Sequence, residues 1–558
     1  MTSDAARAAP MAQPAQDVSA AGAKPVNEVN APKAKKPRDP RLDFFRGCAM
    51  FIILLAHTPG NTWALWIPAR FGFSDGADLF VFCSGMASAL AFGAIFTDRA
   101  WWLGAVRIVH RMWQVYWAHI GIFLVTAIML FIFDHYDLGD PERTYITGPY
   151  VVPLFENTGE ALIGLFTLTY VPGLFDILPM YIVILGMIPF LMLIHRAGGT
   201  PAVLASMFLL WLASNLAGYA FRIDRMAEPV MLNGLQQVLY GIGQTFSFLN
   251  LPSTPWGEGR WFFNPFAWQL IFFSGYVLGM KWVKAPPRSS RLFWICVVYV
   301  VLVIPFAWFK IHRGLYLPDD WWIQNLIADT REAIRPLWLK PDQGALRYLH
   351  FLATAYIAWY LVGPRGIRLS EGFDAPRAAQ TGTLVLAGIV VILTVPYTYI
   401  DMMRVGLPPL DQFFGWLLGP AAISVFGTDL FVPVDRIGVF QLLNLIGSVI
   451  LIWAAIGPKW RHWMTHDLIG HVVPVVRKVG TQSLACFMLS IPLSRFNGFL
   501  LDVVGREPIT WWAVNLWGFA VLIGCAYFVG WLKGQPWRGK PTPPAANPAP
   551  ASPRGALA

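Results

Sequence analysis

The chain has 558 residues, of which 56% are hydrophobic and only 13% are charged, and these values exclude an ordinary water-soluble protein. The formal net charge is +10, but the Lys and Arg residues are scattered among short polar breaks, which excludes a compact nucleic-acid-binding surface and fits contact with anionic lipid. The five cysteines lie inside apolar stretches, with no Cys-x-x-Cys pair and no grouping with histidine. We interpret them as packing residues and expect no metal site and no cofactor.

The two ends of the chain differ in composition from everything between them. Residues 1–40 are rich in Ala, Pro, Lys and Asn and contain no apolar run, and residues 534–558 are rich in Pro and Ala. Such segments cannot bury enough apolar surface to fold. We therefore predict two disordered cytoplasmic tails on either side of one transmembrane domain, residues 41–533.

Apolar stretches long enough to cross a bilayer recur between the tails. A helical span needs about 20 apolar residues, and stretches without period-2 alternation indicate helices and not barrel strands. The predicted fold class is all-α, a polytopic transmembrane helical bundle of about 10–12 spans. The candidate spans are 44–60, 76–97, 113–133, 173–194, 201–219, 264–282, 291–309, 344–362, 380–399, 437–456, 479–501 and 510–532.

Charge differs between alternate loops of this arrangement. One set holds clusters of Lys and Arg, such as Lys281 to Arg291, whereas the opposite loop at 134–172 is acidic. The positive-inside rule then places both termini in the cytoplasm. The outer loops at 220–262 and 310–343 are rich in Trp, Pro, Asn and Gln, and both interfacial anchoring and contact with a carbohydrate would explain this composition.

Ionisable residues inside spans are costly, and they are therefore the first candidates for function. Arg46 and His57 lie in the first span, 11 residues apart. Eleven helical steps return to within about 20° of the starting direction with a rise of roughly 16 Å, so both side chains face the same way at different depths. Arg46 could bind phosphates and His57 could take a proton from a hydroxyl; alternatively, Arg46 reaches lipid headgroups and His57 bonds a neighbouring helix.

Asp78 begins the second span, close along the chain to the outer end of the first. A carboxylate bonded to one imidazole nitrogen of His57 would fix the tautomer that a general base requires. A helix-capping role for Asp78 is the alternative. Arg107 and Arg111, near the start of the third span, could bind an anionic donor or could be ordinary cytoplasmic loop charges.

Four further residues lie near the outer ends of later spans. Asp176 and Tyr181 could contact an acceptor, although an aspartate at a helix start is often only a cap. Arg347 and His350, about one helical turn apart, could bind a carboxylated acyl group or could form an interfacial pair.

The motifs resemble the start of the membrane acyltransferase-3 superfamily: Arg46, ten further residues and His57, then Asp78 to Gly85, then the Arg107 and Arg111 segment. Four other stretches are similar to its OpgC-type branch, which is associated with succinylation of osmoregulated periplasmic glucans. The resemblance covers most of residues 38–500, but the region from about 380 to 465 matches the branch poorly. The stretches are Pro172 to Tyr181, Asn264 to Gln269, Arg347 to Phe351 and Gly480 to Leu484.

The resemblance implies a multi-pass protein of the bacterial inner membrane that moves an acyl group from cytoplasmic acyl-CoA, as co-substrate, to a hydroxyl of a periplasmic polysaccharide. The implied acyl group is succinyl and the implied acceptor is a glucan. By the same carry-over, His57 is catalytic, Arg46 is its motif partner, and Asp78, Arg107 and Arg111 belong to the site. The rival function is a transporter or flippase that uses the buried ionisable residues as a relay.

Overall fold

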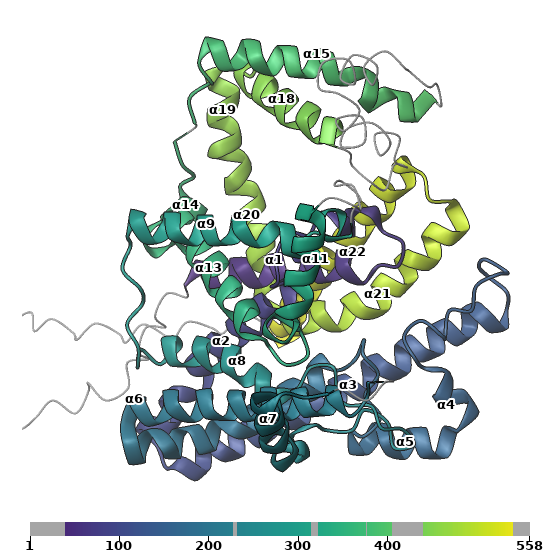
Figure 1. Cartoon of the computed structure of the whole chain (residues 1–558), viewed down its shortest axis with the longest axis vertical. Coiled ribbons are helices and arrows are strands. Elements are labelled where there is room, and N and C mark those ends of the chain that lie inside the picture. Colours follow the sequence, from purple (N-terminus) through teal and green to yellow (C-terminus); the bar gives the residue numbers. More distant parts are fainter. Residues whose placement is uncertain (1–38, 227–230, 314–321, 375, 404–438, 539–558) are drawn as a thin grey trace, which may run out of the picture. The chain divides into compact units, whose positions relative to one another are not determined.

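In a computed structural model of the chain, the described residues are 39–226, 231–313, 322–374, 376–403 and 439–538 (Figure 1). Within these ranges the chain is helical and forms no β-strand, only an isolated bridge between Pro252 and Arg260. The prediction of an all-α membrane protein is confirmed. The two predicted tails, apart from a few residues at their inner ends, and most of the predicted outer loop from Asp401 to Asp435 lie outside the described residues.

Every predicted span corresponds to a helix, and two predicted spans are joined in the single long helix α6. The largest difference in boundaries is in α3, which begins well before residue 113 and so carries Arg107 and Arg111 on the helix itself. The helices are α1 (Pro40–His57), α2 (Gly76–Asp98), α3 (Trp101–His135), α6 (Ile177–Ile223), α8 (Pro265–Gly279), α9 (Ser290–Ala307), α13 (Ala345–Leu361), α15 (Thr381–Met403), α18 (Val439–Ala455), α21 (Ser483–Val504) and α22 (Pro508–Lys533).

Six helices of the described chain are individually long and apolar enough to cross a membrane, or seven if one bent pair is a single span. This count is lower than about 10–12 for identifiable reasons. The helix α6 has 47 residues and a non-helical break at Gly199, where φ is 66°, so it contains two of the predicted spans. The helix α1 carries Arg41, Asp43 and Arg46, while α8 and α13 are short. The higher count stays a prediction.

Shorter helices, mostly not predicted, occupy the connections. The helix α20 is the most consequential, because it packs against both α1 and α22. The others supply loops and turns around the spans. These elements are α4 (Val152–Glu156), α5 (Thr158–Thr167), α7 (Gly234–Thr245), α10 (Phe309–His312), α11 (Trp322–Ala333), α12 (Arg335–Trp338), α14 (Ile367–Ser370), α19 (Pro458–Thr465), α20 (Asp467–Thr481), and the 3-10 turns η1 (Thr62–Leu65), η2 (Pro68–Arg70), η3 (Ser247–Leu249), η4 (Pro364–Gly366) and η6 (Pro536–Arg538).

The helix α8 packs against both α2 and α6 (Figure 1). Its side chains Trp268, Phe272 and Tyr276 are fully buried, as expected for a helix that is apolar on all sides. The crossing with α2 is close: a Cβ added at Gly85 would lie 1.8 Å from the Phe272 carbonyl oxygen, and one at Gly275 would lie 2.1 Å from that of Phe82. Gly85 therefore ends the Asp78 to Gly85 motif because a side chain there would push the two helices apart.

Other helices expose their apolar side chains. On α9, the residues Trp294, Ile295, Val298 and Leu302 are all more than half exposed, and α15 and α22 show the same pattern. Contiguous exposed apolar surface of this extent is unfavourable in water and expected against lipid tails. The helices α15 and α18 lie side by side, with Asn444 donating to the Thr394 hydroxyl over 3.0 Å, a polar contact of the kind that joins helices in a bilayer.

The orientation of the termini stays a prediction, and cysteine labelling tests it. Asn157, between α4 and α5, is exposed, and Lys284, between α8 and α9, is exposed too. In a variant in which the five native cysteines are replaced, an impermeant thiol reagent added to cells with a permeabilised outer membrane should label Asn157→Cys and not Lys284→Cys. The positive-inside rule predicts this result. Labelling of Lys284→Cys but not of Asn157→Cys would show that the topology is the reverse of the predicted one.

Candidate functional site

His57 is the last residue of α1 and is half-buried. Its Nδ1 lies 2.8 Å from the carbonyl oxygen of Ile53, one turn earlier in the same helix. Because a carbonyl oxygen can only accept, Nδ1 must carry the hydrogen of this bond, and in the neutral ring the lone pair is then on Nε2. The ring is therefore held in the tautomer in which Nε2 can accept a proton.

The charges of three side chains interact electrostatically with the His57 imidazole: Lys340, Arg495 and Asp75. Lys340 Nζ forms an ion pair with Asp75 Oδ2 over 2.7 Å, and it lies 5.1 Å from the centre of the Phe263 ring. We call His57, Asp75, Lys340 and Arg495 the His57 cluster. Its members come from the end of α1, the residue before α2, the segment before α13, and α21.

Arg495 differs from the other two charges of this cluster because nothing neutralises it. Its Nε is buried without a hydrogen-bond partner, and no ion pair within the described residues includes it. A half-buried cation without a carboxylate partner is costly in an apolar helix bundle. Arg495 is thus a ready binding group for an anion that reaches the His57 ring.

Asp78 does not bond His57, which corrects the expected carboxylate–imidazole pair. Its carboxylate is fully buried and accepts from Gln343 Nε2 over 2.9 Å, from Arg347 Nε over 3.2 Å and from Arg347 Nη2. It also accepts from the Asp75 amide over 2.8 Å, while the Asp75 side chain caps the start of α2. Asp75 is thus the N-cap of α2, and Asp78, at the third helical position, completes the capping box. The carbonyl of Ile53 fixes the tautomer of His57 in place of Asp78.

Arg347 is bound to Asp78 and to residues just before α2. Beyond Asp78, it forms an ion pair with Asp75 over 3.1 Å and donates to the carbonyl oxygen of Phe73, and only 4% of the residue is exposed. We call Asp78, Gln343 and Arg347 the Asp78 cluster. Because two carboxylates already balance this guanidinium, its contacts give little support to the predicted role in binding an acyl carboxylate.

His350 anchors the chain just before α2. The Ser74 amide donates to Nδ1 over 3.3 Å, and the Ser74 hydroxyl lies 2.7 Å from the same nitrogen. Its Nε2 is buried without a hydrogen-bond partner in the described part of the chain, and the ring fills the space beside Gly72. This arrangement supports a positioning role for His350 and leaves no nitrogen facing an open site.

Asp176 and Tyr181 lie near the start of α6. Asp176 is 1% exposed, its Oδ2 has no hydrogen-bond partner among the described residues, and the charge of Lys340 acts on its carboxyl group. Tyr181 is further along α6, where its hydroxyl lies 3.4 Å from that of Ser88. Asp176 therefore interacts electrostatically with Lys340 of the His57 cluster, whereas the hydroxyl of Tyr181 contacts Ser88.

The predicted donor-binding arginines lie on two helices. Arg46 is half-buried on α1, and its charge interacts electrostatically with the Cys83 thiol on α2. Arg107 is exposed on α3, and Arg111 on the same helix donates to Gln114 over 3.0 Å within a surface network. These contacts do not gather the three arginines around one ligand, so a joint phosphate site stays a prediction.

The helix α20 supplies a basic residue near Arg46 that the sequence analysis missed. The two helices cross closely, since a Cβ added at Gly47 would lie 2.1 Å from the carbonyl oxygen of Val476. Arg477 follows Val476, and its Nε is buried without a partner among the described residues. Arg477 is therefore a second candidate for the phosphates of the donor.

The sequence contained signals for some of the other missed residues. Arg495 lies inside the predicted span 479–501, and the criterion that selected His57, an ionisable residue within a span, applies equally to it. Asp75 stands three residues before Asp78, which is the spacing of a helix capping box. Lys340 has no local signal, because only the tertiary structure brings it to Asp75.

Comparison with known proteins identifies the family. The chain matches the family model described as OpgC protein over residues 38–388 and 374–534. The chain belongs to the OpgC family. The second match includes the region from about 380 to 465, so the family extends over the stretch in which the sequence analysis recognised no motif of the branch. No curated protein matches the chain, and no solved structure does.

Family membership supports a multi-pass membrane protein with an acyltransferase-type function. All four residues of the His57 cluster lie within the ranges that match the family model. The described residues contain no group of three or more His, Cys, Asp or Glu side chains that could hold a metal ion.

We predict that substitutions in the Asp78 cluster lower the stability of the folded protein. Arg347→Met or Asp78→Asn alone should destabilise the protein by about 3–5 kcal/mol, because each leaves a buried group without its partner. The double variant should be less destabilised than the sum of the two. Thermal unfolding of the detergent-purified protein measures this. Arg225→Met, which breaks an exposed pair with Glu258, is the control and should have little effect. Additive losses would show that Asp78 and Arg347 do not interact.

Proposed function

We propose that the chain is an O-acyltransferase that moves an acyl group from acyl-CoA to a hydroxyl of a glucan outside the cytoplasm. The observation that carries the proposal is the tautomer of His57: the Ile53 carbonyl holds Nδ1–H and leaves Nε2 available as a base. Membership of the OpgC family supports the reaction class. The proposed location is the inner membrane of a bacterium.

The proposed transfer needs only groups that the chain and its substrates supply. His57 Nε2 accepts the proton of the acceptor hydroxyl while that oxygen attacks the thioester carbonyl carbon. The new C–O bond forms, the C–S bond breaks, and the departing CoA sulfur takes the proton from the imidazolium. His57 returns to its neutral form, and the products are a glucan ester and free CoA.

The donor would extend along α1. Arg46 and His57 face the same direction with a rise of roughly 16 Å between them, which suits a ligand whose phosphates and thioester are well separated. Guanidinium groups bind phosphate in two parallel hydrogen bonds, so Arg46 and Arg477 are the proposed phosphate contacts. The thioester would then lie beside His57.

Succinyl is the proposed acyl group, and Arg495 is the proposed contact for its free carboxylate. This assignment replaces Arg347, whose charge is balanced by Asp75 and Asp78, with the cation of the His57 cluster that has no carboxylate partner. On the acceptor side, the buried carboxyl group of Asp176, whose Oδ2 has no hydrogen-bond partner among the described residues, is the proposed contact for a sugar hydroxyl.

The rival function, a transporter or flippase, would need its buried ionisable residues to form a connected relay. In this chain, Asp78 and Arg347 are paired with one another and with Gln343. A closed pair of this kind fixes a structure more readily than it passes a proton, so the enzyme is the better-supported proposal.

His57→Ala should abolish acylation of the glucan, and His57→Gln should do the same, because loss of a general base costs about a hundredfold or more in rate. Mass spectrometry of glucans from cells that express each variant measures the substitution. His471→Ala is the matched control, because His471 Nδ1 makes the same bond to the carbonyl four residues earlier, over 2.6 Å, on the exposed side of α20. Normal substitution in a well-expressed His57→Ala strain would exclude His57 as the base.

Arg495→Met should selectively weaken use of a carboxylated donor. Loss of a charged hydrogen bond costs about 1.5–3 kcal/mol, so the KM for succinyl-CoA should rise at least about tenfold while that for acetyl-CoA changes little. Steady-state kinetics of the purified protein test this. Arg143→Met, which removes an exposed partner of Asp502, is the control. An equal change for both donors would remove Arg495 from the acyl carboxylate.

A further inference from the structure

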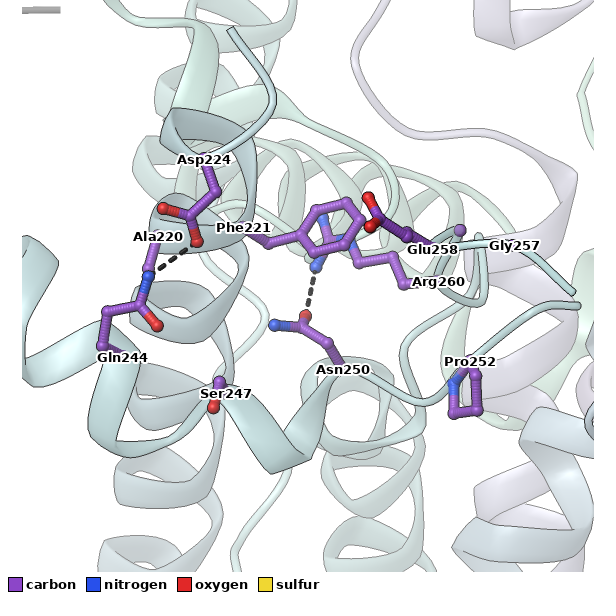
Figure 2. A pocket seen from close by; sticks show the side chains of 11 residues that line it. Ala220, Phe221, Asp224, Gln244, Ser247, Asn250, Pro252, Gly257, Glu258 and Arg260 are labelled. Atoms are coloured by element: carbon purple, nitrogen blue, oxygen red, sulfur yellow. Dashed lines mark hydrogen bonds between the residues drawn. The ribbon is translucent and has the colours of Figure 1, made fainter. Parts of the chain in front are cut away.

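A cavity of about 220 Å³ lies at the far end of α6, apart from the His57 cluster. Figure 2 shows that side chains from α6, α7, η3 and the following loop face this space. Its lining includes Phe221, Asp224, Gln244, Ser247, Asn250 and Arg260. All of these residues belong to the segment 220–262, for which the sequence left a carbohydrate-contacting surface open.

The floor of the cavity is held in place before any ligand binds. Arg260 donates to Asn250 Oδ1 over 2.8 Å (Figure 2). The Asn250 amide in turn donates to the Ala217 carbonyl oxygen over 3.1 Å. The same guanidinium donates to both oxygens of Asp342, over 2.7 and 2.9 Å, and Arg222 pairs with Asp342 too. Polar groups fixed in this way lose little conformational freedom on binding.

The rim offers both donors and acceptors with balanced charge. Gln244 Nε2 donates to Asp224 Oδ2 over 2.6 Å (Figure 2). The Tyr240 hydroxyl donates to Asp224 Oδ1 over 2.6 Å. Three carboxylates at and beneath the cavity, Asp224, Glu258 and Asp342, are balanced in number by the guanidinium groups of Arg222, Arg225 and Arg260, so the cavity does not favour a charged ligand. Amide, hydroxyl and carboxylate groups around a small space suit a neutral ligand with many hydroxyl groups.

A short segment of the chain joins this cavity to the His57 cluster. Lys340 pairs with Asp75 beside His57, Asp342 binds Arg260 on the floor of the cavity, and Gln343 donates to Asp78. Three residues within this four-residue segment thus connect the two places. The segment therefore relates a second polar site to the surroundings of His57, where the acceptor hydroxyl would lie.

We propose that the cavity is an accessory carbohydrate subsite, which binds sugar units of the acceptor glucan on one side of the unit that is acylated. This inference rests on the proposed function, because it assigns the cavity to the same acceptor. The subsite contributes affinity for long acceptors and takes no part in the chemistry. Its contribution is therefore absent for an acceptor too short to reach from His57 to Gln244.

Two variants test the subsite in different ways. Gln244→Ala removes hydrogen-bonding groups, and Ser247→Trp fills the space from an exposed position. The matched controls are Gln237→Ala and Gln237→Trp, on the same helix α7 but outside the cavity lining, where the side chain donates to the Leu232 carbonyl oxygen. Thermal unfolding identifies any variant that does not fold, and the other variant then carries the test.

The measurement is calorimetric binding of glucose disaccharide and octasaccharide to the detergent-purified protein without donor. Each pocket variant should weaken octasaccharide binding by about fivefold or more, from the loss of about one hydrogen bond, and leave the disaccharide unaffected. Unchanged octasaccharide affinity in both variants would overturn the subsite. An absence of octasaccharide binding by the native protein would overturn it too.

Acyl transfer to the same octasaccharide separates this inference from the function on which it rests. If both are right, the pocket variants raise the acceptor KM without changing kcat. If the native protein transfers acyl groups and the pocket variants do so with unchanged KM, only the subsite fails. If the native protein binds octasaccharide through the cavity but transfers no acyl group from any acyl-CoA, the cavity is a carbohydrate site and the acyltransferase assignment fails.

Discussion

The buried ion pair between Asp78 and Arg347 is the constraint on which the arrangement of the site depends. Neither residue can be left alone in an apolar bundle, because an unpaired charge there is costly. Their pairing ties the start of α2 to α13, and Arg347 holds the Phe73 carbonyl and Asp75 at the same time. The chain between α1 and α2 is thereby fixed, and with it the surroundings of His57 at the end of α1.

In the same region, some polar groups have hydrogen-bond partners within the described chain and others have none. Asp78 and Arg347 use their hydrogen-bonding capacity on one another and on neighbouring groups, whereas the described residues fill none of that of His57 Nε2 and Arg495. Groups of the first kind determine structure, and groups of the second kind are available to a substrate. This distinction led us to assign the acyl carboxylate to Arg495 and to treat Arg347 as a positioning residue.

The helix bundle gives these groups a direction. Arg46 and His57 are on one helix at different depths, and α20 crosses that helix tightly enough to bring Arg477 to the Arg46 end. At the His57 end, the segment from Lys340 to Gln343 reaches both the His57 cluster and the floor of the cavity near Arg260. A donor extended along α1 and an acceptor extended along this segment would meet at the imidazole.

The sequence alone determined the helices, because the length and apolarity of a span are local properties that a bilayer selects directly. It also determined that Arg46 and His57 share a face, since the helical period fixes this, and the OpgC-type motifs named the family before the comparison did. Only the tertiary structure decided the partners. Asp78 and Arg347 are 269 residues apart, and neither hydropathy nor periodicity could indicate that Asp78 would choose Arg347 and leave His57 to the Ile53 carbonyl. The positions of Lys340 and Arg495 beside His57 were decided in the same way, because charge pairing between distant segments depends on how the helices pack and not on the sequence around each residue.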